Sequence, residues 1–382
     1  GGGKQYDGRY YPNISGVLRS LNYYPIGDER AEDGIASLAL GLGKYIVDGG
    51  QTLRVSPYHP NQILQTSELD TALRETQTRF YALDTRHVGN DFKVDDGFNI
   101  LNLKVKEAER DNSLNYIAST YDPYDQVIRD GIYDGGRKVI TFASVLQHGV
   151  FPLPQLLQLS MKYGAESMRR PVEIEFACNI NQDRTGALYL LQIRPIVDSK
   201  QMLDEDVAAV PDADCILRSH NSLGHGVTED VTDIVYVKTD DRFTASDNPM
   251  IAREIEKINK TYLDNGTNYV LVGPGRWGSS DSWLGIPVKW PHISAARVIV
   301  EVALKNYRVD PSQGTHFFQN LTSFGVGYFT IDENRGEGFF CKSELDAMPS
   351  VMETEHVRVV RFARPLKIMM DGKRQEGAVL RG

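Results

Sequence analysis

The chain has 382 residues, of which 41% are hydrophobic and 24% are charged, so it is long enough for two or three domains with substantial cores. Its net charge is −9 and no long run of Lys or Arg offsets it, which argues against nucleic acid as the main partner. No apolar stretch approaches the roughly 18 residues that a membrane-spanning helix needs, which excludes such a helix.

The three cysteines indicate the redox environment. Cys178, Cys215 and Cys341 are odd in number, lie far apart and form no C-x-x-C pair. A disulfide framework or a zinc knuckle is therefore not expected, and a reducing cytoplasm fits best. The chain opens with Gly1-Gly-Gly-Lys-Gln-Tyr6 and has neither an initiator Met nor a signal peptide, so we expect a piece cut from a longer polypeptide.

Residues 9–58 are expected to form a compact unit. The pattern predicts a strand over residues 17–24 and a helix over residues 34–42, with Asp33 placed to cap that helix. Residues 45–48 read as the start of a second strand.

The middle of the chain continues with alternating elements. We expect a helix over residues 61–82, strands within residues 88–120 and a short strand over residues 139–142. An amphipathic helix over residues 153–169 then leads into the next strand. The core residues expected within residues 88–120 are Val94, Phe98, Ile100 and Leu103.

The acidic, irregular segment 198–214 marks a domain boundary. Beyond it, a strand over residues 233–238, a helix over residues 249–263 and a strand over residues 268–273 follow in order. This β-α-β pattern predicts a parallel or mixed sheet. Residues 295–304 fit either a buried strand or a helix.

Two strand-like segments, residues 171–176 and 190–195, carry the strongest functional signal. Their side chains alternate between two faces, and the polar loop 181–186 between them ends in glycine, which suits a hairpin. Pairing the strands gathers on one surface the polar residues Glu173, Glu175, Gln192 and Arg194. Oxygen ligands suit Mg2+ and a guanidinium suits phosphate oxygens, so this set fits a Mg-nucleotide site. A surface salt bridge across a hairpin is the simpler alternative.

The same segments resemble a known family. Pro171-Val-Glu-Ile-Glu-Phe176 and Leu190-Leu-Gln-Ile-Arg-Pro195, with a helix before them, resemble the end of the ATP-binding domain of the pyruvate phosphate dikinase and phosphoenolpyruvate synthase family. Three glycine- and proline-containing segments resemble that domain in the same order, so the resemblance covers residues 9–200. They are Ser15–Ser20, Asp33–Gly50 and Leu53–Pro60.

The resemblance implies an ATP-grasp fold and a role for each residue of the set. By resemblance, Glu175 and Gln192 hold Mg2+, Arg194 contacts the phosphates of ATP as the catalytic residue, and Glu173 supports them. An arginine often found near the first segment is replaced here, because Leu21 stands at its position; Arg19 nearby is a candidate substitute.

The second half resembles the family's swivelling phosphohistidine domain only in part. Leu284-Gly-Ile-Pro287 is present, but Asp281 stands roughly where the phosphorylated histidine would be, so no phosphohistidine relay is carried over. Two interpretations stay open for the loop 275–281: anion recognition through Arg276 and backbone N–H groups, or a turn covered by tryptophans.

We therefore predict an α+β or α/β protein. Residues 9–200 would be the C-terminal portion of an ATP-grasp domain and residues 213–382 a smaller mixed α/β domain of unclear role. By resemblance, the full-length parent is an ATP- and Mg-dependent phosphotransferase similar to phosphoenolpyruvate synthase, and this chain, lacking the N-terminal half of that domain, is incomplete alone. The competing hypothesis is a non-catalytic nucleotide-binding or scaffold module. The expected partner is a nucleotide, with no nucleic acid or membrane, and a homo-oligomer is compatible with the sequence.

Overall fold

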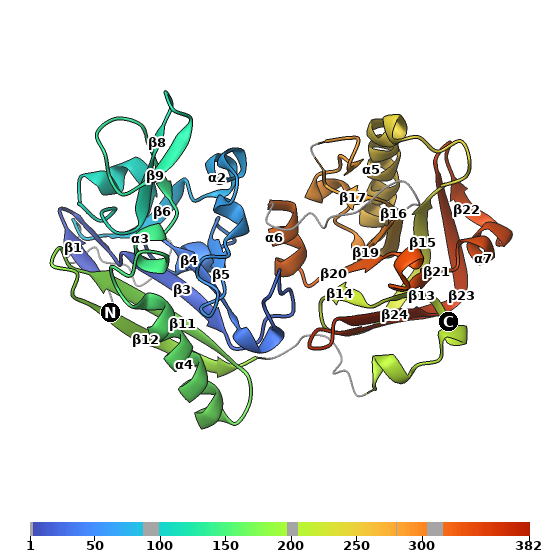
Figure 1. The fold of residues 1–382 in the computed structure, drawn as a ribbon, viewed down its shortest axis with the longest axis horizontal. Helices are drawn as coiled ribbons and strands as arrows, with labels where there is room; N and C mark the ends of the chain where they lie inside the picture. The colour runs from blue at the N-terminus through green and yellow to red at the C-terminus, as the bar shows by residue number, and fades with distance from the viewer. Residues whose placement is uncertain (1–2, 87–98, 197–204, 280, 304–315) are drawn as a thin grey trace. The chain divides into compact units, whose positions relative to one another are not determined.

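The chain divides into two compact units. The computed structural model describes residues 3–86, 99–196, 205–279, 281–303 and 316–382 (Figure 1). Unit 1 comprises Gly1–Asn22 and Gly27–Val197, and unit 2 comprises Tyr23–Ile26 and Asp198–Gly382. Helices and several sheets occur together, as the expected α+β class requires. In the described part of the chain, no helix is both long and apolar enough to cross a membrane.

Unit 1 is built on a five-stranded antiparallel sheet with the strand order β12-β11-β3-β4-β5. Its strands are β3 (Ile14–Arg19), β4 (Ile35–Ala39), β5 (Leu53–Val55), β11 (Val172–Ile180) and β12 (Gly186–Pro195). Helix α4 (Leu153–Met168) packs against one face at Gly164, where an added Cβ would lie 2.9 Å from Ile193 Cδ1 and 3.1 Å from Ile174 Cδ1. The opposite face stays partly open and carries polar side chains.

Two smaller sheets and three short α-helices complete the described part of unit 1. One sheet has the order β1-β2-β6-β7 and the other β10-β8-β9. Their strands are β1 (Lys4–Tyr6), β2 (Arg9–Tyr11), β6 (Arg79–Asp84), β7 (Ile100–Lys104), β8 (Ala118–Asp122), β9 (Val127–Asp130) and β10 (Arg137–Ile140). The helices are α1 (Lys44–Val47), α2 (Leu69–Glu75) and α3 (Ala143–Leu146). Buried side chains from all three sheets join in one hydrophobic core.

The helix expected over residues 34–42 is wrong, because this segment contains strand β4. Alanine and leucine favour helix locally. Here, however, Ala36 and Leu38 are buried and alternate with half-buried Ile35 and Ser37, and β4 is hydrogen-bonded on both sides. Pairing with two neighbouring strands overrides the local propensity.

Other expectations in unit 1 hold only in part. The strand expected over residues 45–48 is wrong, since helix α1 lies there, and the helix expected over residues 61–82 shrinks to α2. The helix expected over residues 153–169 is confirmed as α4. Val94 and Phe98, expected in the core, lie outside the described residues.

Gly16 on β3 lies directly beneath the Phe176 ring of β11, and a Cβ at this glycine would overlap the ring. We expect Gly16→Ala to lower the free energy of unfolding of unit 1 by about 1–3 kcal/mol, since overpacking must displace the ring. Thermal unfolding followed by circular dichroism measures this change. Gly43→Ala is the matched control, because its Cβ would meet nothing closer than 3.7 Å. Equal destabilisation by the two substitutions would contradict the argument.

Unit 2 contains a mixed ten-stranded sheet with the order β14-β20-β19-β16-β15-β23-β24-β13-β21, and β22 pairs with β23. Its strands are β13 (Cys215–Ser219), β14 (Asn221–Leu223), β15 (Gly226–Val237), β16 (Tyr269–Pro274), β19 (Ala296–Val302), β20 (Gly327–Ile331), β21 (Phe339–Phe340), β22 (Ser350–Glu353), β23 (Val357–Asp371) and β24 (Glu376–Leu380). The short pair β17 (Arg276–Trp277) and β18 (Gly285–Ile286) stands apart. The helices are α5 (Asn248–Asn265), α6 (His316–Ser323) and α7 (Lys342–Ala347).

The predicted β-α-β pattern of unit 2 is confirmed. Strands β15 and β16 are parallel and α5 connects them, and β19 and β20 continue the parallel run. The ambiguous segment 295–304 contains strand β19. The carboxyl ends of the four parallel strands β15, β16, β19 and β20 therefore lie at the same end of the sheet.

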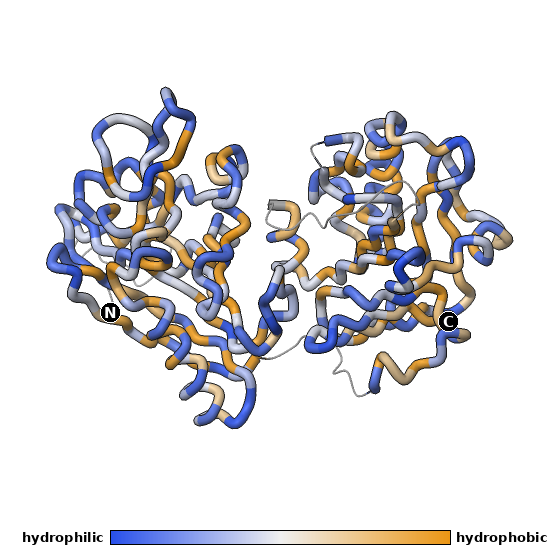
Figure 2. The backbone as a smooth tube through the Cα atoms, in the orientation of Figure 1, coloured by the Kyte–Doolittle hydropathy of each residue, from blue (hydrophilic) through white to orange (hydrophobic). Residues whose placement is uncertain are grey.

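Figure 2 shows hydrophobic residues concentrated along the strands of each unit, while the loops are hydrophilic.

Candidate nucleotide-phosphate site

The β11–β12 hairpin fixes the relative positions of the four predicted site residues. The strands are antiparallel, with Glu173 opposite Arg194 and Glu175 opposite Gln192. After these two pairs the register shifts, because Phe176 faces Leu190 and Leu191 has no opposite residue. Such a bulge bends and twists its strand. The antiparallel register confirms the predicted pairing of the two strands as a hairpin.

The two faces of β11 differ as strand alternation predicts. Ile174 and Phe176 are buried against the core of unit 1, whereas Glu173 and Glu175 are only partly buried. On β12, which is the edge strand of the sheet, Gln192 and Arg194 are exposed. The polar set therefore lies on the face away from α4.

Arg194 is held mainly by Glu173. The Nε of Arg194 donates to Glu173 Oε1 at 2.9 Å and Nη2 donates to the same oxygen, while Nη2 lies 3.7 Å from Glu175 Oε1. These contacts, led by the hydrogen bonds to Glu173, raise the pKa of Arg194 above its ordinary value. The salt bridge of the simpler interpretation is thus present, and it also fixes the guanidinium on the polar face.

Arg19 joins this cluster from the neighbouring strand. It pairs with Glu173 in the β11–β3 register, and its Nε lies 3.7 Å from Glu173 Oε2. Glu173 therefore lies between two guanidinium groups, one on each adjacent strand. Arg19 lies on the polar face. This position suits its expected role as a substitute for the family arginine that Leu21 replaces.

Glu175 and Gln192 form the pair of oxygen donors suited to a cation. They are cross-strand neighbours, and the Glu175 side chain is 32% exposed, so water or phosphate oxygens can reach it. Mg2+ commonly keeps several waters and takes one or two protein oxygens, which this pair fits. Within the described residues, no group of three or more His, Cys, Asp or Glu side chains could hold a metal. Any Mg2+ here would thus need further oxygens from a ligand.

Sequence reasoning missed Arg54 on the same face. The cross-strand registers run from Glu175 through Val17 and Ser37 to Arg54 on β5. Three strand spacings place its backbone about 14 Å from that of Glu175. Arg54 donates to the Asn22 side chain at 2.8 Å. The alternation Leu53-Arg54-Val55, with both neighbours buried, is the signal that could have placed it.

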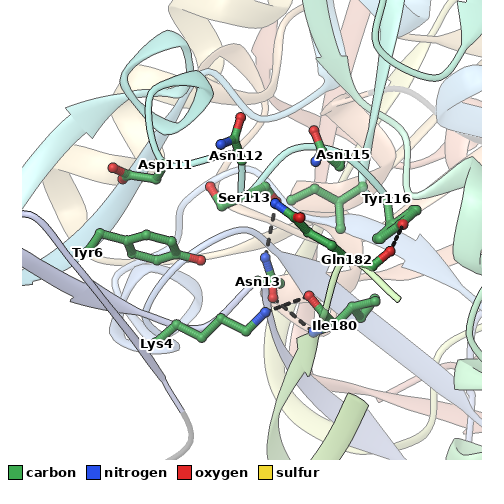
Figure 3. Close-up of a pocket in the computed structure, with 11 residues that line it drawn as sticks. Lys4, Tyr6, Asn13, Asp111, Asn112, Ser113, Asn115, Tyr116, Ile180 and Gln182 are labelled. Atoms are coloured by element: carbon green, nitrogen blue, oxygen red, sulfur yellow. Dashed lines mark hydrogen bonds between the residues drawn. The ribbon is translucent and has the colours of Figure 1, made fainter. Parts of the chain in front are cut away.

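A cavity of about 180 Å³ in unit 1 lies apart from these residues (Figure 3). Most of its lining residues have polar side chains, and the Lys4 ammonium donates to the Ile180 carbonyl at 2.5 Å. The Asn13 side chain donates to the Ser113 carbonyl and accepts from the Ile180 N–H, as the dashed lines in Figure 3 show. None of the predicted site residues lines this cavity. The predicted site is an open sheet face rather than an enclosed pocket.

The loop after β16 favours the turn interpretation over anion recognition. Its backbone N–H groups are used inside unit 2: those of Gly275, Arg276 and Gly278 donate to carbonyl oxygens, and that of Trp277 donates to the Glu301 carboxylate. Trp277 is fully buried, whereas Trp283 is exposed, so only one of the two tryptophans expected to cover the turn is packed into unit 2. The Leu284–Pro287 segment supplies β18, which pairs with β17 of this same loop.

Three histidines of unit 2 have structural partners. His292 accepts from the Lys289 N–H, His225 stacks on Tyr23, and His220 forms an ion pair with Glu376. The side chain of His316 lies outside the described part. These contacts do not support a phosphohistidine relay.

Comparison with known proteins identifies the family of this chain. A family model described as the pyruvate phosphate dikinase AMP/ATP-binding domain matches residues 7–212, which is more than half of the chain. The chain therefore belongs to this family, as the sequence resemblance predicted, and the match supports AMP or ATP as its ligand. The matched span includes Glu173, Glu175, Gln192 and Arg194. No curated protein matches the chain.

Proposed function

We propose that residues 9–200 are the C-terminal portion of an ATP-grasp domain, and that the parent protein is an ATP- and Mg-dependent phosphotransferase resembling phosphoenolpyruvate synthase. The observation that carries the proposal is the hairpin register, which sets Glu175 opposite Gln192 and Glu173 opposite Arg194 inside the family-matched span. The open polar face supports it, because a nucleotide phosphate needs access to these side chains.

In this proposal each side chain has one task. Glu175 and Gln192 hold Mg2+, which when bound neutralises charge on the phosphate oxygens. Arg194 donates to the transferring phosphoryl group and stabilises the charge that develops there. Glu173 positions Arg194, since it already accepts from both Nε and Nη2 of that guanidinium. Arg19 adds a second positive charge beside Glu173.

The test is calorimetric titration of Mg-ATP into the full-length parent protein in its wild-type form and into its Glu175→Ala and Arg194→Ala variants, in parallel with this chain. We expect the wild type to bind and each variant to bind about 10- to 100-fold more weakly, because each loses a charge-assisted contact worth about 1.5–3 kcal/mol. Removing Mg2+ with a chelator should weaken binding by the wild type and change little in Glu175→Ala.

Matched controls separate the site from general charge effects. Arg184→Ala changes an exposed arginine in the turn of the same hairpin, and Glu166→Ala changes an exposed glutamate on α4. Both should bind Mg-ATP like the wild type. If the wild type fails to bind Mg-ATP, or if both site variants bind unchanged, the non-catalytic scaffold hypothesis replaces the proposal.

A further inference from the structure

Unit 2 has a cavity of about 230 Å³ at the carboxyl ends of its parallel strands. Strands β15, β16 and β19 end at Val237, Pro274 and Val302, and all three residues line the cavity. The remaining walls come from the segment after β20 and from the start of α7. In open α/β sheets, ligands bind in the crevice outside the carboxyl ends of the parallel strands. The cavity therefore occupies the place in this sheet where a ligand is expected.

The floor of the cavity is apolar and one wall is aromatic. Val272 and Val302 supply branched aliphatic side chains from two adjacent strands, and the half-buried Phe340 contributes its ring. Pockets for small molecules combine such a lining with a few polar groups. This lining suits a flat, largely apolar body.

The rim of the cavity carries hydrogen-bonding groups of mixed kind. They are the Thr239 hydroxyl, the Asn334 amide and the Glu333 carboxylate. Oε1 of Glu333 accepts from the Phe340 N–H at 2.8 Å, which fixes the carboxylate and leaves Oε2 able to accept from a ligand. The rim therefore favours a ligand that presents N–H donors along one edge.

The charges around the cavity disfavour a phosphate. Among the described residues that line it, Lys342 is the one cation, and its Nζ is already bound to Asp346 Oδ2 at 2.7 Å. With Glu333 on the rim, an incoming dianion would meet more negative than positive charge.

We propose that unit 2 binds a neutral, nucleoside-sized heteroaromatic molecule, of the purine nucleoside class, in this cavity at the carboxyl ends of β15, β16 and β19. The ring lies on the aliphatic floor beside Phe340, and its N–H edge donates to Glu333. The site lies outside residues 7–212 and is independent of the function proposed for residues 9–200.

The test is saturation-transfer NMR and calorimetry on the whole chain, with adenosine and guanosine as probes. We expect at least one probe to bind the wild type, Glu333→Gln to bind it at least 10-fold more weakly, and Thr239→Trp, which fills the cavity from its rim, to abolish binding. Glu337→Gln is the matched control, because this exposed glutamate lies in the same segment but does not line the cavity. It should bind like the wild type.

The outcomes also separate this proposal from the one for unit 1. Nucleoside binding should persist in Arg194→Ala, whether or not that variant binds Mg-ATP. Loss of nucleoside binding in Arg194→Ala but not in Glu333→Gln would place the site in unit 1 and overturn the proposal. Failure of both probes to bind the wild type at millimolar concentration would overturn it too. Glu333 is exposed, so Glu333→Gln keeps the test valid if Thr239→Trp fails to fold.

Discussion

Replacing Glu301 by Gln should make unit 2 more stable than the wild type at pH 8, by about 4 kcal/mol, and leave the two proteins nearly equal near pH 4. Glu301 lies on β19 and is fully buried. Burial raises its pKa to about 8, although hydrogen bonds from Tyr328 and from the Trp277 N–H oppose the change. Gln keeps an oxygen that can accept from the Trp277 N–H at 3.0 Å and carries no charge.

The sign of the pH dependence follows from the raised pKa. In the unfolded chain a glutamate loses its proton near pH 4.3, whereas in the folded protein Glu301 keeps the proton up to about pH 8. The contribution of Glu301 to the free energy of unfolding is therefore fully present below about pH 4.3 and is lost as the pH rises to about 8. The variant has no titrating group at this position, so the difference between the two proteins isolates Glu301.

Denaturant unfolding followed by tryptophan fluorescence measures this effect in unit 2 alone, because Trp277, Trp283 and Trp290 are the three tryptophans of the chain and all belong to unit 2. Glu337→Gln, an exposed control, should match the wild type at every pH. A difference between wild type and Glu301→Gln that stays constant from pH 4 to pH 8 would show that Glu301 has an ordinary pKa.

The sequence predicted best those elements that strong local patterns specify. The alternating segment of β11, the long amphipathic α4 and the β15-α5-β16 unit all occur where expected. In each case burial in the fold and the local pattern agree. The site residues on β11 and β12 could be placed together for the same reason, since two alternating strands and a short polar loop leave one simple pairing.

The failures have a common physical origin in contacts between distant segments. Strand β4 looks helical by composition and becomes a strand only because β3 and β5 pair with it on either side. The bulge at Leu191 and the approach of Arg19 to Glu173 depend on strand registers that no single segment encodes. The unit 2 cavity could not be predicted from the sequence either, because its walls come from segments more than 100 residues apart, from Val237 to Lys342.

We expect Arg361→Ala to lower the stability of unit 2 by about 2–4 kcal/mol. Asp233 on β15 is buried, and Arg361 on β23 donates to both of its oxygens, at 2.8 and 2.9 Å. Tyr262 of α5 donates to Oδ2 at 2.5 Å, so this carboxylate joins a helix and two strands. Removing the arginine leaves a buried carboxylate without its charge partner, which is strongly destabilising. The expected loss of stability is smaller than the largest losses known for broken buried ion pairs, because Arg361 is half exposed and water can replace part of its contact.

The pH dependence distinguishes this mechanism from a simple loss of packing. Burial alone would raise the pKa of Asp233, but hydrogen bonds from Arg361, Tyr262 and Thr232 hold it below its usual value. In the wild type this stabilisation is therefore present above about pH 4 and is lost only as the pH falls through the lowered pKa. In Arg361→Ala the remaining burial should raise the pKa of Asp233. The free energy of unfolding of this variant should therefore increase on acidification, over a pH range in which that of the wild type decreases.

Arg364→Ala is the matched control, since Arg364 is an exposed arginine on the same strand and forms no ion pair among the described residues. It should change the free energy of unfolding by less than about 0.5 kcal/mol. Adding Asp233→Asn to Arg361→Ala should recover part of the lost stability, because the double variant has no buried charge left to compensate. If the double variant is instead less stable by the full sum of the two single changes, Asp233 and Arg361 act independently. The ion pair would then not be what joins α5, β15 and β23.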